Sequence, residues 1–255
     1  MGTDIHLHVE KRTKDGKWHW VREVPTEYRN PWLVEQAEKR KASSKTTAFD
    51  RYYLRGSCEK WFDTRNYNAF AILANVRNGR GFAGCETGAG FKFIAEPRGL
   101  PEDMSEELLR GVLLYEHNYD DAFASDDDMA IDDFGDHSQS WVTLAELLAV
   151  NWDEGATQYG VIPFPAWKPG EAPKDYSAWI SGGNIVIIDA RNRDEFAVHL
   201  EAQRLADAGK EVYVQIAWGE TYKEAAGDLY TRLLPALKSL GGDPNDVRIV
   251  FGFDS

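Results

Sequence analysis

Two histidines and two carboxylates alternate with aliphatic residues in the stretch DIHLHVE near the start of the sequence. Residues 4–10 therefore have the period of two of a half-buried strand, with Asp4, His6, His8 and Glu10 on one face. Imidazole and carboxylate groups are common ligands of Zn²⁺ and Mn²⁺, and alternate residues of a strand can reach one ion. The pattern predicts a divalent metal, zinc or manganese, held by Asp4, His6 and His8. A polar face turned towards water is the alternative.

Further candidates for the same chemistry lie in the second half of the sequence. Asp254 ends the final predicted strand, 247–253, and chain ends often lie close together. We therefore expect Asp254 near Asp4 or His6, as a further metal ligand. His137 follows Asp136 in the stretch FGDHSQSW, where it could move a proton as a general acid–base. The alternative is a loop histidine without a catalytic role.

Arg65, Asn66 and Tyr67 come directly before a predicted helix. The arginine fork binds phosphate or carboxylate through two parallel hydrogen bonds, and a helix N-terminus adds positive potential. Trp141 could stack on a base. These four residues are the predicted ligand-binding set. The alternatives are an ion pair between Arg65 and an acidic side chain, and a packing role for Trp141.

Asp15-Gly16 predicts a β-hairpin, because a type I′ turn requires positive φ at both central residues. Closing the hairpin there pairs residues 4–10 with 17–24 and places His8 opposite Glu23. Cross-strand partners share a face. The predicted register therefore brings His19 and Glu23 onto the face that carries His8.

The C-terminal third predicts alternating strands and helices, at residues 184–190, 193–209, 211–219, 221–242 and 246–255. A charged helix is predicted over 31–48, an acidic loop over 116–137, a helix over 140–150 and a loop over 152–175. We expect one α/β (mixed α+β) domain of residues 1–255. In it, the N-terminal β-hairpin and the C-terminal β-α-β-α-β unit share one mixed sheet, with a loop-rich middle. A subdivision would separate residues 1–150 from 180–255.

The 255-residue chain has a net charge of −13, with 42 acidic side chains against 29 lysines and arginines. Such a surface repels nucleic-acid phosphates and anionic membranes, so neither is an expected partner. No signal peptide or apolar run of membrane-spanning length is present. Two cysteines without a CxxC pairing fit reduced thiols in a cytoplasm. The oligomeric state stays open.

Two resemblances bear on function. DIHLH resembles the D-x-H-x-H that opens the first strand of amidohydrolases and PHP-type phosphoesterases, where the histidines bind a catalytic metal. Those enzymes are barrels of eight βα units, whereas this sequence shows two such units and begins with a hairpin. Across most of its length the chain resembles an uncharacterised family of bacteriophage and prophage proteins, in MGTDIHLHVEKR, RNYNAFAILANVRNG, PRGLPEDMS, HSQSW and VRIVFGFDS. This second resemblance implies a phage origin and the cytoplasm of a bacterial host.

The functional hypothesis is a phage accessory protein that binds or hydrolyses a small phosphorylated, nucleotide-like ligand. The phage resemblance implies a role against host defences that signal through nucleotides. The enzymatic version is metal-dependent phosphoester hydrolysis, with the ion on Asp4, His6 and His8 and proton transfer by His137. The alternative is a non-enzymatic acidic protein that binds and inhibits a host enzyme.

Overall fold

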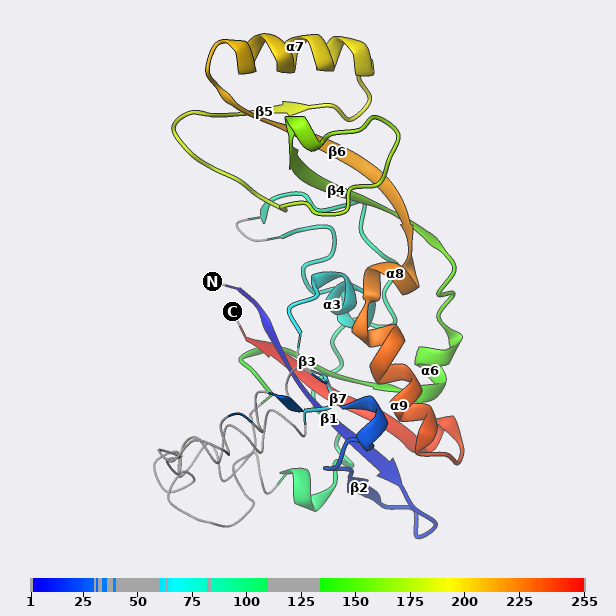
Figure 1. The fold of residues 1–255 in the computed structure, drawn as a ribbon. Helices are drawn as coiled ribbons and strands as arrows, with labels where there is room; N and C mark the ends of the chain where they lie inside the picture. Colours follow the sequence, from blue (N-terminus) through cyan, green and yellow to red (C-terminus); the bar gives the residue numbers. More distant parts are fainter. Residues whose placement is uncertain are drawn as a thin grey trace. The chain divides into compact units, whose positions relative to one another are not determined.

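The computed structural model describes residues 2–29, 31, 34–35, 39, 60–62, 64–81, 84–109 and 134–254, which divide into two compact units (Figure 1). The terminal unit comprises residues 1–66, 94–150 and 227–255, and the central unit comprises 67–93 and 151–226. Both units combine separated parts of the chain, so their boundaries differ from a division into 1–150 and 180–255. The predicted helix over 31–48 and the acidic stretch up to residue 133 lie almost wholly outside the described residues.

The terminal unit contains a four-stranded antiparallel sheet in the order β2-β1-β7-β3. Its strands are β1 (Asp4–Arg12), β2 (Trp18–Trp20), β3 (His137–Thr143) and β7 (Val247–Asp254). The first and last strands of the chain pair along eight positions, from Asp4 opposite Asp254 to Lys11 opposite Val247. The prediction that the two chain ends share a sheet is confirmed.

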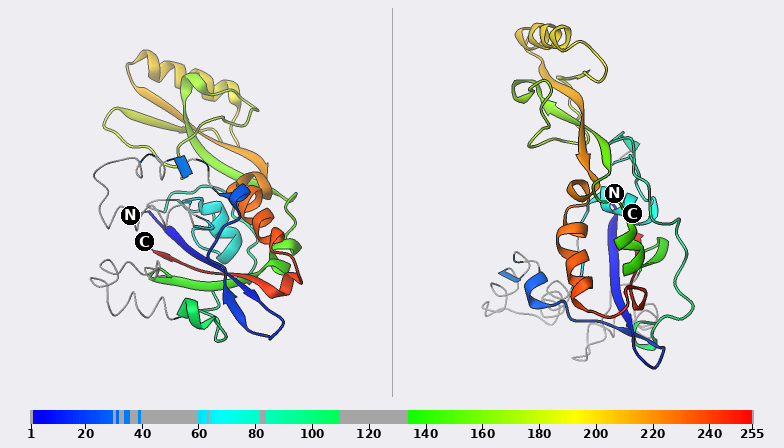
Figure 2. Two further views of the ribbon diagram at one scale, coloured as in Figure 1. Left: turned by 60° about the horizontal axis from the view of Figure 1, so that its bottom comes forward. Right: turned by 90° about the vertical axis from the view of Figure 1, so that its right-hand side faces the viewer.

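Both faces of this sheet are covered. Ile5, Leu7 and Val9 are buried on the apolar face, as the period of two predicts. Figure 2 shows η4 (Leu229–Leu233) and α9 (Leu234–Ser239) on one side of the sheet, and the chain around residues 98–109 on the other. The described part of the unit also contains the short elements α6 (Leu144–Ala149), η1 (Thr26–Tyr28) and η5 (Pro244–Asp246).

The central unit is built on a three-stranded mixed sheet in the order β4-β6-β5. β4 (Gly155–Pro163) pairs antiparallel and β5 (Ile185–Asp189) parallel with β6 (Glu211–Thr221). Helix α7 (Glu195–Asp207) packs on one face, where Val198 and Ala202 join a buried cluster with Val214. The unit also contains α3 (Tyr67–Ala74), η3 (Phe164–Ala166) and α8 (Tyr222–Ala226).

The prediction of one shared mixed sheet is wrong, because the strands form two sheets. β5 and β6 are parallel neighbours joined through α7, as predicted, but β7 pairs with β1 and β3 in the other sheet. The place beside β6 is taken by β4, in the stretch 152–175 that predicted a loop because it is rich in Pro, Gly and Trp. Nine residues of β4 pair with β6, and this long-range pairing overrides the weak local propensity.

The predicted hairpin forms, but its register is wrong by one residue. Glu10 lies opposite Trp20 and Lys11 opposite His19. The loop is longer than a two-residue turn, because Thr13 N donates to Lys17 O, and Gly16 alone supplies the positive φ, at 82°. A one-residue shift moves every side chain of a strand to the other face. His19 therefore does not share the face of His8.

Two predicted helices are also interrupted. Residues 140–143 belong to β3, and the helix begins only after Thr143, whose side chain and Glu146 form a capping box. The helix predicted over 221–242 breaks at Gly227, where φ is +53°, and continues through Pro235 in α9. Glycine adopts this left-handed conformation at little cost, whereas proline is tolerated at the start of α9.

Candidate functional site

The predicted site residues converge in part, at the end of the sheet where β1 begins and β7 ends. Asp4 N donates to Asp254 Oδ1 at 3.0 Å, and His6 Nε2 lies 3.2 Å from Asp254 Oδ2. Asp254 thus lies beside both residues, as predicted from the two chain ends. Burial alone would raise the pKa of Asp254, but hydrogen bonds from His6 and from the backbone of Asp4 lower it below its ordinary value. The ionised carboxylate accepts, so Nε2 carries the proton that His6 donates.

Arg65 lies at the same end of the sheet. Its guanidinium forms two hydrogen bonds to the carboxylate of Asp4, one of them from Nη2 to Oδ2 at 2.7 Å. The side chains are exposed, 65% for Arg65 and 42% for Asp4. Arg65 therefore forms an ion pair with an acidic side chain, which was the alternative to a ligand-binding role. Asp4, His6, Asp254 and Arg65 are called the end cluster below.

His8, the third predicted metal ligand, lies deeper on the same face, among aromatic rings. Its imidazole contacts Trp20 at 5.9 Å and Phe134 at 5.0 Å between ring centroids, both edge to face. His8 is 9% exposed and Glu10, two residues on, is fully buried. The alternative of a solvated polar face is therefore wrong for these two positions.

His137 lies at the same end of the sheet but on the other face. It pairs with Phe253 of β7, which also pairs with Ile5, and its ring stacks on Phe253 at 6.0 Å between centroids. Its Nδ1 lies 2.9 Å from Ser138 Oγ. Because cross-strand partners share a face, His137 is on the side of Ile5, opposite His6. Asp136 is exposed in the preceding turn.

The predicted ligand-binding residues are divided between the two units. Tyr67 begins α3 in the central unit, where it contacts Phe70 and the guanidinium of Arg77. Asn66 is the last residue of its segment of the terminal unit. Trp141 lies in β3 beneath the guanidinium of Arg98, 4.8 Å from the ring centroid. Trp141 therefore packs in the sheet, in line with the packing alternative.

Among the residues that the structure describes, no group of three or more His, Cys, Asp or Glu side chains is placed to hold a metal ion. In the end cluster, His6 Nε2 is engaged by Asp254, and Asp4 by Arg65. A metal on these residues would have to displace both contacts. Zinc or manganese binding remains a prediction.

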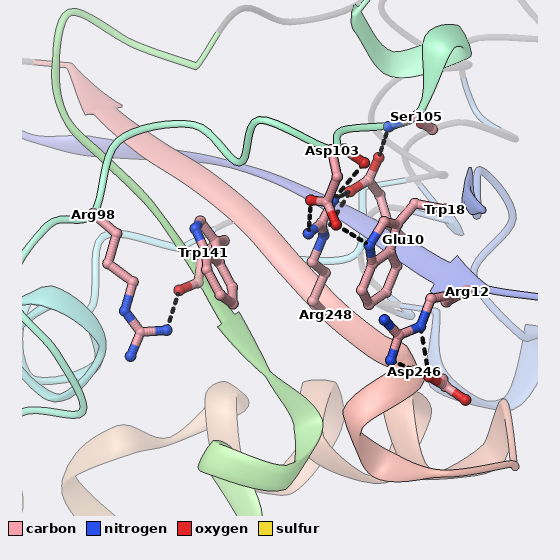
Figure 3. A network of polar contacts seen from close by, with 9 residues as sticks. All are labelled: Glu10, Arg12, Trp18, Arg98, Asp103, Ser105, Trp141, Asp246 and Arg248. Carbon is pink, nitrogen blue, oxygen red and sulfur yellow. Dashed lines mark hydrogen bonds and ion pairs between the residues drawn. The ribbon is translucent and has the colours of Figure 1, made fainter. Parts of the chain in front are cut away.

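A buried ionic network that the sequence pattern did not predict lies on the same polar face (Figure 3). Glu10 accepts hydrogen bonds from Arg248 Nε at 2.8 Å and from Ser105 N at 2.7 Å. Arg248 also donates to Asp103, at 2.7 Å, and Trp18 Nε1 donates to the same carboxylate at 2.8 Å. The network attaches residues 103–105 to β1, β2 and β7. In the sequence, this network is indicated only by the alternation of residues 4–10, which we interpreted as metal ligands.

A second ion pair attaches the start of the segment 98–109, which covers the polar face, to the edge of the sheet. Arg98 donates to Glu146, with its shortest contact at 2.6 Å, and to the carbonyl of Trp141 at 3.2 Å. Burial alone would raise the pKa of Glu146, but hydrogen bonds from Arg98 and Thr143 lower it. Positioning rather than catalysis is the evident role of these residues.

Close backbone packing covers the polar face at Gly252 of β7. A Cβ added to Gly252 would lie 1.8 Å from the carbonyl oxygen of Phe134, and one added to Gly135 would lie 2.2 Å from that of Phe253. The segment 134–135 therefore lies directly against Gly252 of β7, the residue that pairs with His6. Glycine at position 252 is what permits this approach.

Comparisons of the chain with protein-family models, with curated proteins and with solved structures gave no match. Function is therefore inferred from the side chains themselves. None of the helices in the described part of the chain is long and apolar enough to cross a membrane.

Proposed function

We propose that the protein is a binding module for a small phosphorylated, nucleotide-like ligand, with the end cluster as its phosphate site. The observation that supports this proposal is the fork of Arg65, held in bidentate geometry by a carboxylate at an exposed position. Phosphate oxygens fit the same fork as carboxylate oxygens. A phosphate group could therefore take the place of Asp4.

The exchange of Asp4 for phosphate at Arg65 costs little free energy. An exposed ion pair contributes about 0–1 kcal/mol to stability, so a ligand loses little by displacing Asp4 from Arg65. His6 Nε2 lies 3.2 Å from Asp254 Oδ2 and keeps that partner when Arg65 exchanges Asp4 for phosphate.

The hydrolytic version of this proposal requires a larger rearrangement. His6 and Asp4 would both have to leave their present partners and turn towards one ion that activates water. Binding requires the exchange at Arg65 alone, which is why we prefer it. The phage resemblance suggests a setting for either version, in which the protein removes a nucleotide signal of the host.

The experiment is a calorimetric titration with pyrophosphate and with ATP, in buffer without divalent cations. We expect binding by the wild type and a loss of about tenfold or more in Arg65→Gln, which corresponds to one charge-assisted hydrogen-bond pair. Arg65→Lys keeps the charge but not the fork, and should recover only part of the affinity. Arg12→Gln is the matched control, because Arg12 forms a similar exposed ion pair with Asp246 at the other end of β1.

Equal affinity of the wild type and Arg65→Gln would overturn the phosphate site. Elemental analysis of the wild type and His6→Ala tests the hydrolytic version separately. A stoichiometric metal that His6→Ala loses, with release of phosphate by the wild type only, would favour hydrolysis. Absence of binding together with co-purification of a host protein would favour the acidic inhibitor.

A further inference from the structure

A second cluster of chemically distinctive side chains lies in the central unit, at one end of the sheet face that α7 covers. Trp218 and Glu220 are alternate residues of β6 and share a face with their partners on β4, Gln158 and Ala156. The ring of Tyr176 packs against Trp218 at 4.7 Å between centroids, edge to face. Two aromatic rings and one carboxylate are thereby brought together.

A glycine makes this arrangement possible. A Cβ added to Gly160 would lie 2.7 Å from the ring of Tyr176 and 3.1 Å from the ring of Trp218. Any larger residue at this position of β4 would push the rings apart. The side chain of Tyr176 is nevertheless half exposed, so the aromatic surface remains open to a ligand.

The carboxylate of Glu220 is half-buried, and within the described part of the chain no positively charged side chain acts on it. Burial raises its pKa, a hydrogen bond from Trp218 opposes the rise, and the charge of Glu224 adds to it. Among the described residues, the one charged group that acts on Glu220 is thus another carboxylate. Lys223 and Lys92 pair with other carboxylates, those of Asp153 and Glu154, both at 2.6 Å.

Gln158 gives an independent sign of an unfilled position. It is 3% exposed, and its Nε2 has no hydrogen-bond partner within the described part of the chain. Buried polar groups nearly always find a partner, so this amide donor calls for an acceptor, which the hydroxyl group of a ligand would supply. Gln158 lies directly opposite Trp218, on the face that carries the cluster.

We propose that Tyr176, Trp218 and Glu220 form a binding site for a small organic ammonium ion. The two rings offer negative π-faces to the cation, and the carboxylate supplies the opposite charge. A half-buried carboxylate gains more from a cation than an exposed one does, because the lower local dielectric strengthens the attraction. An anionic ligand is disfavoured by Glu220 and Glu224, and a purely apolar ligand would leave Glu220 without a partner.

The experiment compares choline with 3,3-dimethyl-1-butanol, a neutral molecule of nearly the same shape, at pH 7.5. Binding is followed through the indole N–H signal of Trp218 in two-dimensional NMR, assigned with Trp218→Phe. We expect choline to shift this signal and to bind about tenfold or more tightly than the alcohol. Glu220→Gln should weaken choline binding by about tenfold, as expected for loss of a charge-assisted contact. Butylammonium serves as a second cationic probe.

Glu211→Gln is the matched control, because Glu211 is an exposed carboxylate of the same strand, hydrogen-bonded to Tyr213. It should bind choline as the wild type does. Equal affinity for choline and the alcohol, or unchanged choline affinity in Glu220→Gln, would overturn the proposal. So would the failure of both cations to shift the Trp218 signal. The proposal does not depend on the phosphate site, since no residue is shared.

Discussion

Replacement of Glu10 by alanine tests whether the ionic network on the polar face is a buried structural element. Glu10 is fully buried and Arg248 is 2% exposed, so the substitution leaves a guanidinium without its buried counter-charge. It also removes the acceptor of the Ser105 N–H, which lies 2.7 Å from the carboxylate. Breaking a buried ion pair from one side costs about 3–5 kcal/mol. Arg248 keeps Asp103, so we expect a loss of about 3–4 kcal/mol.

The matched control is Arg12→Ala, on the same strand and face as Glu10. Arg12 pairs with Asp246 where both side chains are more than a third exposed, so its loss should cost less than about 1 kcal/mol. A second comparison is Glu10→Leu combined with Arg248→Met. Replacing both charges by apolar side chains should restore most of the stability lost in Glu10→Ala, because Asp103 is exposed and can be hydrated.

Urea unfolding and amide hydrogen exchange provide the assay. Urea is preferred to guanidinium chloride because it does not screen ion pairs. The exchange rate of the Ser105 amide reports the local contact, and its protection should fall in Glu10→Ala while that of residues in α7 is unchanged. A loss below about 1 kcal/mol, similar to that of Arg12→Ala, would refute the view that the network is sealed from water.

Two further predictions concern the same unit. Gly252→Ala should destabilise the protein by about 1–3 kcal/mol in thermal unfolding, because its Cβ would lie 1.8 Å from the Phe134 carbonyl; Gly219→Ala, a strand position with open space around it, should change little. Acid should also destabilise the terminal unit, because the pKa values of Asp103 and Glu146 in the folded state lie below their ordinary values. The stability that these two carboxylates contribute is present above about pH 4.5 and is lost as the pH falls through their folded-state pKa values. Asp103→Asn with Glu146→Gln should flatten this dependence of stability on pH, whereas Glu102→Gln, a change at an exposed neighbour, should leave it; an unchanged slope in the double variant would contradict the assignment.

The sequence was a good guide where a pattern depends on neighbours along the chain. The alternation of residues 4–10 defined β1 and its buried aliphatic face, and helix α7 begins with Asp194 as its cap and ends before Gly209, which has φ of +78°. Thr143 caps α6, and the residues before it form a strand instead of the predicted first helical turn. These features follow from side-chain period and local hydrogen bonding, which a single sequence contains.

Pairing between distant strands was harder to predict. β4 has glycine at two of its nine positions and ends in proline, so its local sequence favours a loop, yet it pairs with β6 over its whole length. The hairpin register failed for a related reason. Asp15 accepts from the backbone of Lys17, and the extra loop residues shift the partners by one. A loop of this kind and a two-residue turn share the same Asp-Gly signal.

The polar face of β1 shows what a period of two leaves undetermined. The period says which side chains share a face, but not what lies over them. Here the cover changes along one strand: Asp4 is 42% exposed, His8 is packed among aromatic rings, and Glu10 is fully buried in an ionic network. The residues that cover His8 and Glu10 come from 103–105 and 134–135, far away in the sequence. Within the described part of the chain, the open end of this face is the one that carries Asp4 and Arg65, and the test of the proposed function is whether Arg65 exchanges Asp4 for phosphate there.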